Sequence, residues 1–329
     1  MADRYLITGG SGFIGTNLID HLSDQGEHLL NVDINPPYKE EHNKYWHRLD
    51  ILGKKHLCEV FFNYKPTHVI HLAARTDMDG KKIDDYRTNF DGTINVLEAI
   101  KSTPSIERTI ITSSQFVHQF KGKPEHDEDY APHTVYGESK ILTETYTRKA
   151  DLSCIWTIIR PTNIWGPWHP RYPKEFWLVL KKGRYLHPGK QPVVRMYGYV
   201  GNVVHQIMKI FKSPPVKVNH KVFYVGDKPI NLLDWVNGFS QKLVGKKVTT
   251  VPRILVKNIA VAGDILMLCG ITFPITSSRY KSMTTDNEIS MDETFELFGD
   301  PPYSLQDGIN KTVKWLIEQN SQFWTSSLT

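Results

Sequence analysis

The sequence contains only three cysteines in 329 residues, Cys58, Cys154 and Cys269, and no C-x-x-C pair. So sparse a set excludes a disulfide framework and a cysteine-based zinc site, and it is typical of a reducing compartment. No signal-peptide pattern precedes the first apolar run. We therefore expect a cytoplasmic protein without a metal site.

Strongly basic runs and long hydrophobic runs are also missing. The formal net charge is only +5 and the lysine pairs are isolated, which argues against a nucleic-acid partner. The most apolar segment, residues 254–275, is interrupted by Lys257, Asn258 and Asp264. Its clean runs fall short of the ~18 residues that a membrane span requires. The segment predicts an amphipathic helix on the core, or alternatively a helix lying on a membrane surface.

The first motif that is present is a short apolar run leading into a glycine-rich turn. Gly9, Gly12 and Gly15 follow the spacing G-x-x-G-x-x-G. In a strand–turn–helix unit these glycines permit the tight turn, the approach of backbone to a pyrophosphate, and close packing of helix on strand. The helix end then offers N–H groups and a positive dipole end to phosphates. The motif predicts a phosphate-binding turn, with a plain turn as the alternative.

Strands and helices alternate through the first half of the chain. Apolar patterns predict strands at 5–7, 29–33, 46–51, 67–74, 108–114 and 154–160, and helices at 12–24, 57–62, 83–101 and 135–150. This alternation predicts an α/β fold with a doubly wound parallel Rossmann sheet. The regularity ends after Pro161. We therefore expect a dinucleotide-binding domain over 1–165, to which later elements return, and a smaller, mainly substrate-binding lobe over 166–329.

Two carboxylates stand at the ends of expected strands. Asp33, 18 residues after Gly15, can accept hydrogen bonds from both adenosine ribose hydroxyls and would repel a 2′-phosphate. The following Ile34 and Asn35 supply no arginine for such a phosphate, so NAD is favoured over NADP. Asp50 can accept from the adenine amino group. The alternatives are a turn cap for Asp33 and a helix N-cap for Asp50.

A candidate reactive pair follows in the expected helix 135–150. Tyr136 and Lys140 are four residues apart and so share one helix face. A cation there lowers the pKa of a phenol, which can then take a proton from a hydroxyl as hydride leaves the same carbon. Tyr-x-x-x-Lys alone is common on solvated helices. It gains weight from Ser114 at the carboxyl end of a predicted strand, where ligands collect in open α/β sheets.

The glycine turn, Asp33, Ser114 and the Tyr136–Lys140 pair follow one another along the chain as they do in one known family. The chain resembles the extended short-chain dehydrogenases/reductases, specifically the nucleotide-sugar epimerases and dehydratases. The matching stretches are Thr-Gly-Gly-Ser-Gly-Phe-Ile-Gly at 8–15, His-Leu-Ala-Ala at 71–74, Asn-Phe-Asp-Gly-Thr-Ile-Asn-Val at 89–96, Tyr-Gly-Glu-Ser-Lys at 136–140, Arg-Pro-Thr-Asn-Ile-Trp-Gly-Pro at 160–167 and Arg-Met-Tyr-Gly-Tyr-Val at 195–200.

The resemblance implies roles for individual residues. Tyr136 becomes the general base and acid, Ser114 bonds the reacting oxygen, and Lys140 also holds the nicotinamide ribose. Substrate contacts are implied for Ser114, Gln115, Asn163 and Arg195, with the arginine clamping a pyrophosphate or, alternatively, lying free on the surface. The implied NAD contacts are Gly9, Gly12, Phe13, Ile14, Gly15, Asp33, Asp50, Ile51, Leu72, Ala73, Ala74, Asn89, Thr112, Tyr136, Lys140 and Pro161. A homodimer is also implied.

One departure from the family narrows the reaction. The 4,6-dehydratases carry an Asp-Glu pair directly after the Ser114 position, whereas this chain has Gln115 and Phe116, which cannot relay protons. Elimination is therefore disfavoured. We expect an NAD-dependent nucleotide-sugar 4-epimerase of polysaccharide biosynthesis. A nucleotide-sugar dehydrogenase or 4-keto-sugar reductase, a hydroxysteroid-dehydrogenase-like enzyme and a non-catalytic NAD sensor remain open. The charged loop 75–80 has no assigned role.

Overall fold

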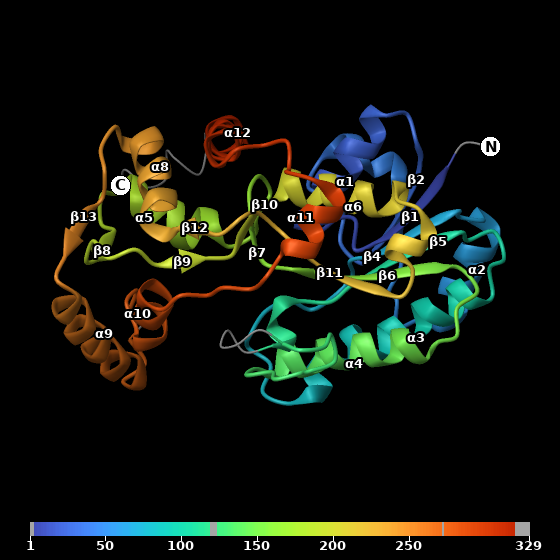
Figure 1. Ribbon diagram of the computed structural model, residues 1–329, viewed down its shortest axis with the longest axis horizontal. Helices are drawn as coiled ribbons and strands as arrows, with labels where there is room; N and C mark the ends of the chain where they lie inside the picture. The colour runs from blue at the N-terminus through green and yellow to red at the C-terminus, as the bar shows by residue number, and fades with distance from the viewer. Residues whose placement is uncertain (1–2, 119–123, 272, 320–329) are drawn as a thin grey trace. The chain divides into compact units, whose positions relative to one another are not determined.

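The computed structural model describes residues 3–118, 124–271 and 273–319, and it divides into two compact units (Figure 1). Unit 1 comprises Met1–Ile164, Val200–Gly226 and Ser290–Pro302. Unit 2 comprises Trp165–Tyr199, Asp227–Ile289 and the chain from Tyr303 onward. The predicted reactive residues all lie in unit 1, whereas Arg195 lies in unit 2.

Unit 1 is built on a seven-stranded sheet in the order β11-β6-β5-β4-β1-β2-β3, and every adjacent pair is parallel. The strands are β1 Arg4–Thr8, β2 His28–Asp33, β3 Trp46–Arg48, β4 His68–His71, β5 Arg108–Thr112, β6 Ile155–Pro161 and β11 Lys221–Val225. The predicted doubly wound α/β fold is confirmed. The strand order reverses between β1 and β4, and ligands bind beyond the carboxyl ends of strands at such a switch point.

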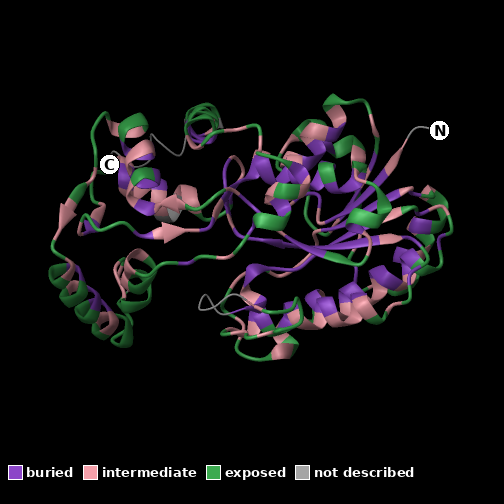
Figure 2. Cartoon of the chain, viewed as in Figure 1, coloured by how far each residue is buried: buried purple, intermediate pink, exposed green. Residues whose placement is uncertain are grey.

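Helices cover both faces of this sheet. Figure 1 shows α1 and α6 on one face and α2, α3 and α4 on the other. Their bounds are α1 Phe13–Asp24, α2 Lys54–Tyr64, α3 Arg87–Lys101, α4 Val135–Lys149 and α6 Val200–Lys212, with the shorter α7 Pro215–Val218 and α11 Asp292–Phe298. Because the sheet is covered twice, the inner strands are buried along their length, as Figure 2 shows. In β1, for example, Leu6 and Ile7 are both fully buried.

Several predicted boundaries are wrong in detail, among them the strand expected over 108–114, which ends at Thr112, and the helix expected over 57–62, which is Lys54–Tyr64. The strand expected over 46–51 ends at Arg48, and the one expected over 67–74 ends at His71. The helix expected from residue 83 starts as a 3₁₀ turn, Ile83–Tyr86, and α3 follows directly at Arg87. The Asp85 carboxylate accepts from the backbone N–H groups of Lys81 and Lys82 at the start of this turn. Such side-chain bonds to the backbone do not show in an apolar pattern.

Unit 2 consists of short strands and helices around an aromatic core. Trp165, Trp177 and Phe239 are fully buried, and Trp235 stacks on Phe176 at 4.8 Å between ring centroids. The elements are η4 Pro173–Trp177, α5 Leu178–Lys181, β8 Leu186–Pro188, β9 Val194–Arg195, β10 Tyr197–Tyr199, β12 Ile230–Asn231, α8 Leu232–Val244, β13 Thr249–Val251, α9 Arg253–Leu268, α10 Ser277–Thr284 and α12 Leu305–Gln319. Across the described ranges, no helix combines the length and the apolar content of a membrane span.

Candidate active site

The glycine turn has the geometry that its spacing predicts. Gly9 has φ +77°, and a Cβ there would lie 2.5 Å from the backbone nitrogen of Ala73. Gly12 is the N-cap residue of α1 and has no side-chain cap, and no acidic residue occupies the first turn of α1. A Cβ at Gly15 would lie 2.5 Å from the Cα of Gly10, so Gly15 packs on the turn itself rather than on a strand. The end of α1 is thus open to an anion.

Asp33 fastens this turn to the end of β2. Its carboxylate accepts hydrogen bonds from the backbone N–H of Ser11 at 3.1 Å and of Asn35 at 2.9 Å. Burial raises the pKa of the Asp33 carboxyl, and these backbone donors act in the opposite direction. The buried Asn31 donates to the Ser11 hydroxyl at 3.0 Å, a brace that the spacing of the glycines did not reveal. The carboxylate lies where the ribose of a bound adenosine is expected.

Tyr136 and Lys140 occupy one face of α4, as predicted. Lys140 is buried, and its ammonium donates to the carbonyl oxygen of Thr112 at 2.8 Å. Burial lowers the pKa of Lys140 to about 8, with the charge of Glu144 acting against that shift. The ring of Tyr136 contacts the rings of Tyr86 and Phe116, with centroids 6.0 Å away in each case. Lys140 is therefore mostly charged at neutral pH and can support a phenolate on Tyr136.

The segment after β5 packs against α4 and carries the predicted residues Ser114 and Gln115, followed by Phe116. The hydroxyl of Ser114 accepts from the backbone N–H of Phe116 at 3.2 Å and caps the 3₁₀ turn Gln115–Val117. Phe116 meets the Tyr136 ring edge-on. Gln115 is completely buried, and neither its amide nitrogen nor its oxygen has a hydrogen-bond partner among the described residues. An unsatisfied buried amide is costly, which is consistent with a ligand that completes it.

Asn89 braces the chain beyond β4 against α4. Its side chain is fully buried, accepts from the backbone N–H of Arg75, and donates to the Arg75 carbonyl and the Ser139 hydroxyl. These hydrogen bonds use both the oxygen and the nitrogen of the Asn89 side-chain amide. Asn89 would therefore affect a bound cofactor only by positioning the backbone at Arg75. His71 lies nearby, hydrogen-bonded to Thr8 and Thr93, and burial lowers its pKa to about 3, so it is neutral.

The loop 75–80 is held together by an ion pair between two of its own residues. Arg75 forms a two-point ion pair with Asp77 at 2.8 and 2.9 Å and also donates to the carbonyl of Asp85. The Tyr86 hydroxyl donates to the Asp77 carbonyl and accepts from Gly80. Since Tyr86 also contacts the ring of Tyr136, this loop helps to position the candidate base, a role the sequence did not assign.

Other predicted cofactor contacts lie at strand ends or in the core. Asp50 is exposed and accepts from the backbone N–H of Leu52 at 2.9 Å in a local turn, whereas Ile51 belongs to the core beneath the sheet. Leu72 donates its N–H to the Thr8 carbonyl just after β4. Asn163 is half-buried at the start of β7, Asn163–Trp165, and Pro161 ends β6.

In unit 2, Arg195 has a neighbour that the sequence did not identify. A guanidinium nitrogen of Arg195 donates to the carbonyl of Thr285 at 3.2 Å, and an isolated bridge joins Arg195 to Asn287. Asn287 is 1% exposed, yet neither atom of its side-chain amide is paired within the described ranges. The Nε of Arg195 is likewise unpaired there. The Nε of Arg195 and the side-chain nitrogen of Asn287 can therefore donate hydrogen bonds to an anionic group.

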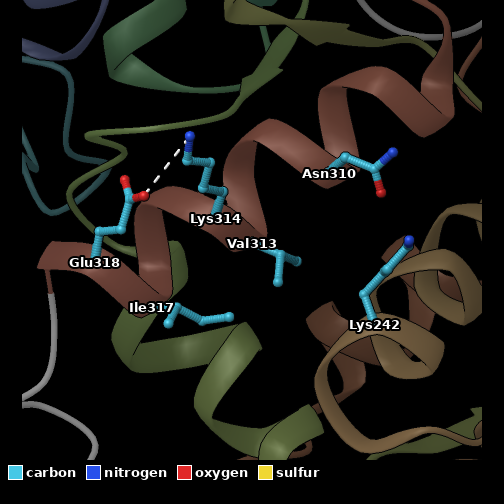
Figure 3. Close-up of a pocket in the computed structure, with 6 residues that line it drawn as sticks. All are labelled: Lys242, Asn310, Val313, Lys314, Ile317 and Glu318. Carbon is cyan, nitrogen blue, oxygen red and sulfur yellow. Dashed lines mark ion pairs between the residues drawn. The ribbon is translucent and has the colours of Figure 1, made fainter.

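An open cavity of about 380 Å³ also lies in unit 2 (Figure 3). It is lined by Lys242, Asn310, Val313, Lys314, Ile317 and Glu318. Lys314 and Glu318 form an ion pair at 3.7 Å on its rim. No predicted catalytic or cofactor residue lines it, so we do not assign the active site there. In the described part of the chain, no cluster of His, Cys, Asp and Glu could hold a metal ion.

Comparison with known proteins agrees with the motifs in unit 1. Residues 5–226 match the model of the NAD dependent epimerase/dehydratase family. The chain belongs to this family. It is therefore an NAD-dependent enzyme of the short-chain dehydrogenase/reductase type, and the predicted family and cofactor are confirmed.

Individual relatives cover nearly the whole enzyme. It is 26% identical, over 96% of each chain, to the N-acetyl-α-D-glucosaminyl-diphospho-ditrans,octacis-undecaprenol 4-epimerase of Escherichia coli O157:H7. Its fold is similar to that of the Thermotoga maritima UDP-glucose 4-epimerase with UDP-glucose (TM-score 0.74, 21% identity, 96% of this chain and 99% of that one). It is also similar to the Thermus thermophilus UDP-glucose 4-epimerase with NAD (TM-score 0.70, 22% identity, 97% and 99%).

The residues of unit 1 fit NAD. The open end of α1 at Gly12 suits a pyrophosphate, Asp33 suits the adenosine ribose, and Lys140 suits the second ribose. When bound, NAD supplies a hydride acceptor that can also return the hydride. The pairing of β2 with β3 also places a cation next to Asp33. Arg48 on β3 lies opposite Asp33 and is exposed.

Replacing Asp33 with alanine should weaken NAD binding by at least about 10- to 100-fold, since each hydrogen bond to a charged acceptor contributes ~1.5–3 kcal/mol. Because Arg48 remains, NADP should lose much less affinity, and the preference for NAD should shrink. Calorimetric titration with both cofactors measures this. Asp24→Ala, at the exposed far end of α1, is the matched control. Unchanged NAD affinity in the Asp33 variant would rule out its role at the ribose.

Proposed function

We propose that the enzyme epimerises a diphosphate-linked sugar at C4, with a nucleotide sugar as the expected substrate. Tyr136 takes the proton of the C4 hydroxyl while Ser114 holds the same oxygen. Lys140, buried and bonded to Thr112, stabilises the phenolate. The proton returns from Tyr136 after the keto sugar has presented its other face to the cofactor.

The single observation that carries this proposal is the chemistry of the two residues that follow Ser114. Gln115 is buried and its amide has no hydrogen-bond partner among the described residues, and Phe116 packs edge-on against the ring of Tyr136. Neither side chain can remove a proton from C5 or deliver one to a leaving hydroxyl at C6. The site therefore favours hydride removal and return over elimination of water.

For the substrate diphosphate we propose Arg195 together with Asn287, which lie in the same unit. The substrate contacts of Gln115 and Asn163 stay predictions. A guanidinium binds phosphate oxygens in pairs, and a buried amide without partners gains two hydrogen bonds when a ligand arrives. The E. coli relative is named for a sugar on an undecaprenyl diphosphate, and the T. maritima structure holds UDP-glucose. Both kinds of sugar carrier present a diphosphate.

We also propose that the enzyme is a homodimer.

The reaction is tested with purified enzyme, NAD and UDP-sugars deuterated at C4, followed by NMR and by NADH absorbance. An epimerase gives the C4 epimer with deuterium retained at C4 and no net NADH, because the hydride returns to the carbon that it left. The same assay is repeated with a sugar carried on a polyprenyl diphosphate as the substrate. Stoichiometric NADH would instead indicate a dehydrogenase, and a deoxy-keto product would indicate a dehydratase. Either result contradicts the proposal.

A further inference from the structure

Helix α9 in unit 2 is apolar on two opposite faces. Val256, Ala260 and Gly263 form its buried face, and a Cβ at Gly263 would meet the carbonyl of Ile275. The other face carries Ile254, Val261, Ile265 and Leu268, which are 63, 48, 58 and 88% exposed. Their spacing of 7, 11 and 14 residues from Ile254 places them along a single stripe of the helix. The amphipathic core helix expected for residues 254–275 thus accounts for only one of these faces.

Together with Leu255, Met267 and Ile271, the stripe makes this segment the main concentration of exposed large hydrophobic side chains among the described residues. Those seven residues, all within 254–271, are half of the fourteen large hydrophobic side chains that are exposed across the described ranges. Single exposed hydrophobic residues need no explanation, whereas a contiguous exposed patch marks an interaction site. Figure 2 shows α9 as largely exposed along its length.

The charges around the stripe are almost all positive. On α9 and on α10, which packs against it, the basic residues are Arg253, Lys257, Arg279 and Lys281, and all but the partly buried Arg253 are exposed. The one acidic residue of these two helices, Asp264, accepts from the backbone N–H of Ser277 and so ties α9 to α10. A second copy of the chain in a two-fold contact would set this basic surface against itself. An anionic lipid surface would instead complement it.

We propose that α9 docks the enzyme on the surface of an anionic membrane, with the stripe Ile254–Val261–Ile265–Leu268 inserted among the lipid headgroups. An apolar stripe flanked by lysine and arginine is the pattern of a helix that lies in the interface plane. With 16 residues, α9 is ~24 Å long, too short to cross the ~30 Å hydrocarbon layer. The helix lies on the membrane and does not span it. This docking is separate from the proposed reaction, because it requires no substrate.

The test is sedimentation of the full-length enzyme with vesicles of phosphatidylcholine containing roughly 30% phosphatidylglycerol. Ile265→Glu/Leu268→Glu should reduce vesicle binding more than about tenfold, because two carboxylates enter the apolar layer next to anionic lipid. The matched control is Phe62→Glu/Val216→Glu, which places the same charges on exposed apolar side chains of α2 and α7 in unit 1. This control should bind vesicles as the unmodified enzyme does. NAD binding and thermal unfolding establish that each variant is folded.

A charge variant separates attraction by lipid headgroups from apolar insertion. Lys257→Gln/Lys281→Gln should weaken binding roughly tenfold on anionic vesicles and much less on pure phosphatidylcholine. The proposal is overturned if the unmodified enzyme stays in the supernatant, or if the two α9 glutamates leave vesicle binding unchanged. It is also overturned if those glutamates dissociate an oligomer in analytical ultracentrifugation without affecting vesicle binding, since the stripe would then be a contact between copies.

Discussion

Replacing Tyr136 with phenylalanine should lower kcat about 10³-fold while NAD binding persists, because general acid–base catalysis contributes ~10²–10⁴-fold. The substitution removes only the hydroxyl. The ring contacts with Tyr86 and Phe116 remain, so the fold around α4 should be unchanged. Steady-state kinetics of C4 epimerisation and calorimetric titration with NAD measure the two effects.

Tyr146→Phe, ten residues further along the same helix, is the matched control and should keep full activity. A Tyr136→Phe enzyme with undiminished kcat would show that another group takes the proton. Loss of turnover with NAD binding intact would exclude a non-catalytic NAD sensor, because a sensor has no turnover to lose.

The largest expected effect on stability comes from a buried ion pair between α4 and β6. Glu144 on α4 and Arg160 on β6 are both 0% exposed, and two of the guanidinium nitrogens donate to the carboxylate oxygens at 2.8 Å each. Glu144→Gln would leave the Arg160 charge buried without its counterion. We expect a loss of about 3–5 kcal/mol in the free energy of unfolding at neutral pH, measured by denaturant titration.

The same pair predicts a pH dependence. Burial alone raises the pKa of Glu144, but the hydrogen bonds and charge of Arg160 outweigh it and hold that pKa below its usual value. A carboxyl whose pKa is lower in the folded state stabilises the protein above its unfolded-state pKa. This contribution is lost as the pH falls through the folded-state pKa. The stability of the unmodified enzyme should therefore fall more steeply with acid than that of Glu144→Gln.

The control for this pair is the exposed ion pair between Arg87 and Asp91 on α3. Arg87→Met should change the free energy of unfolding by less than about 1 kcal/mol, since exposed pairs contribute little. If Glu144→Gln cost no more than Arg87→Met, the buried pair would not be a main support of α4.

Local motifs allowed most of unit 1 to be predicted. The glycine turn, the strand ending at Asp33 and the Tyr136–Lys140 pair depend on residues within a few positions of one another, and regular spacing encodes them. The ends of β3 and β4 were predicted too late because the apolar pattern continues beyond them, into segments where Asp50 bonds Leu52 and Asn89 bonds Arg75 instead of a strand ladder. No periodic pattern reports such bonds.

The sequence by itself determined the family, the NAD cofactor and the loss of the dehydratase acid–base pair at Gln115 and Phe116, because each depends on which residue occupies a motif position. Only the tertiary structure decided that Glu144 pairs with Arg160 and that Asn287 lies beside Arg195. It also decided which face of α9 is buried. Contacts between residues far apart in the chain depend on strand order and helix packing, which residue spacing alone does not record.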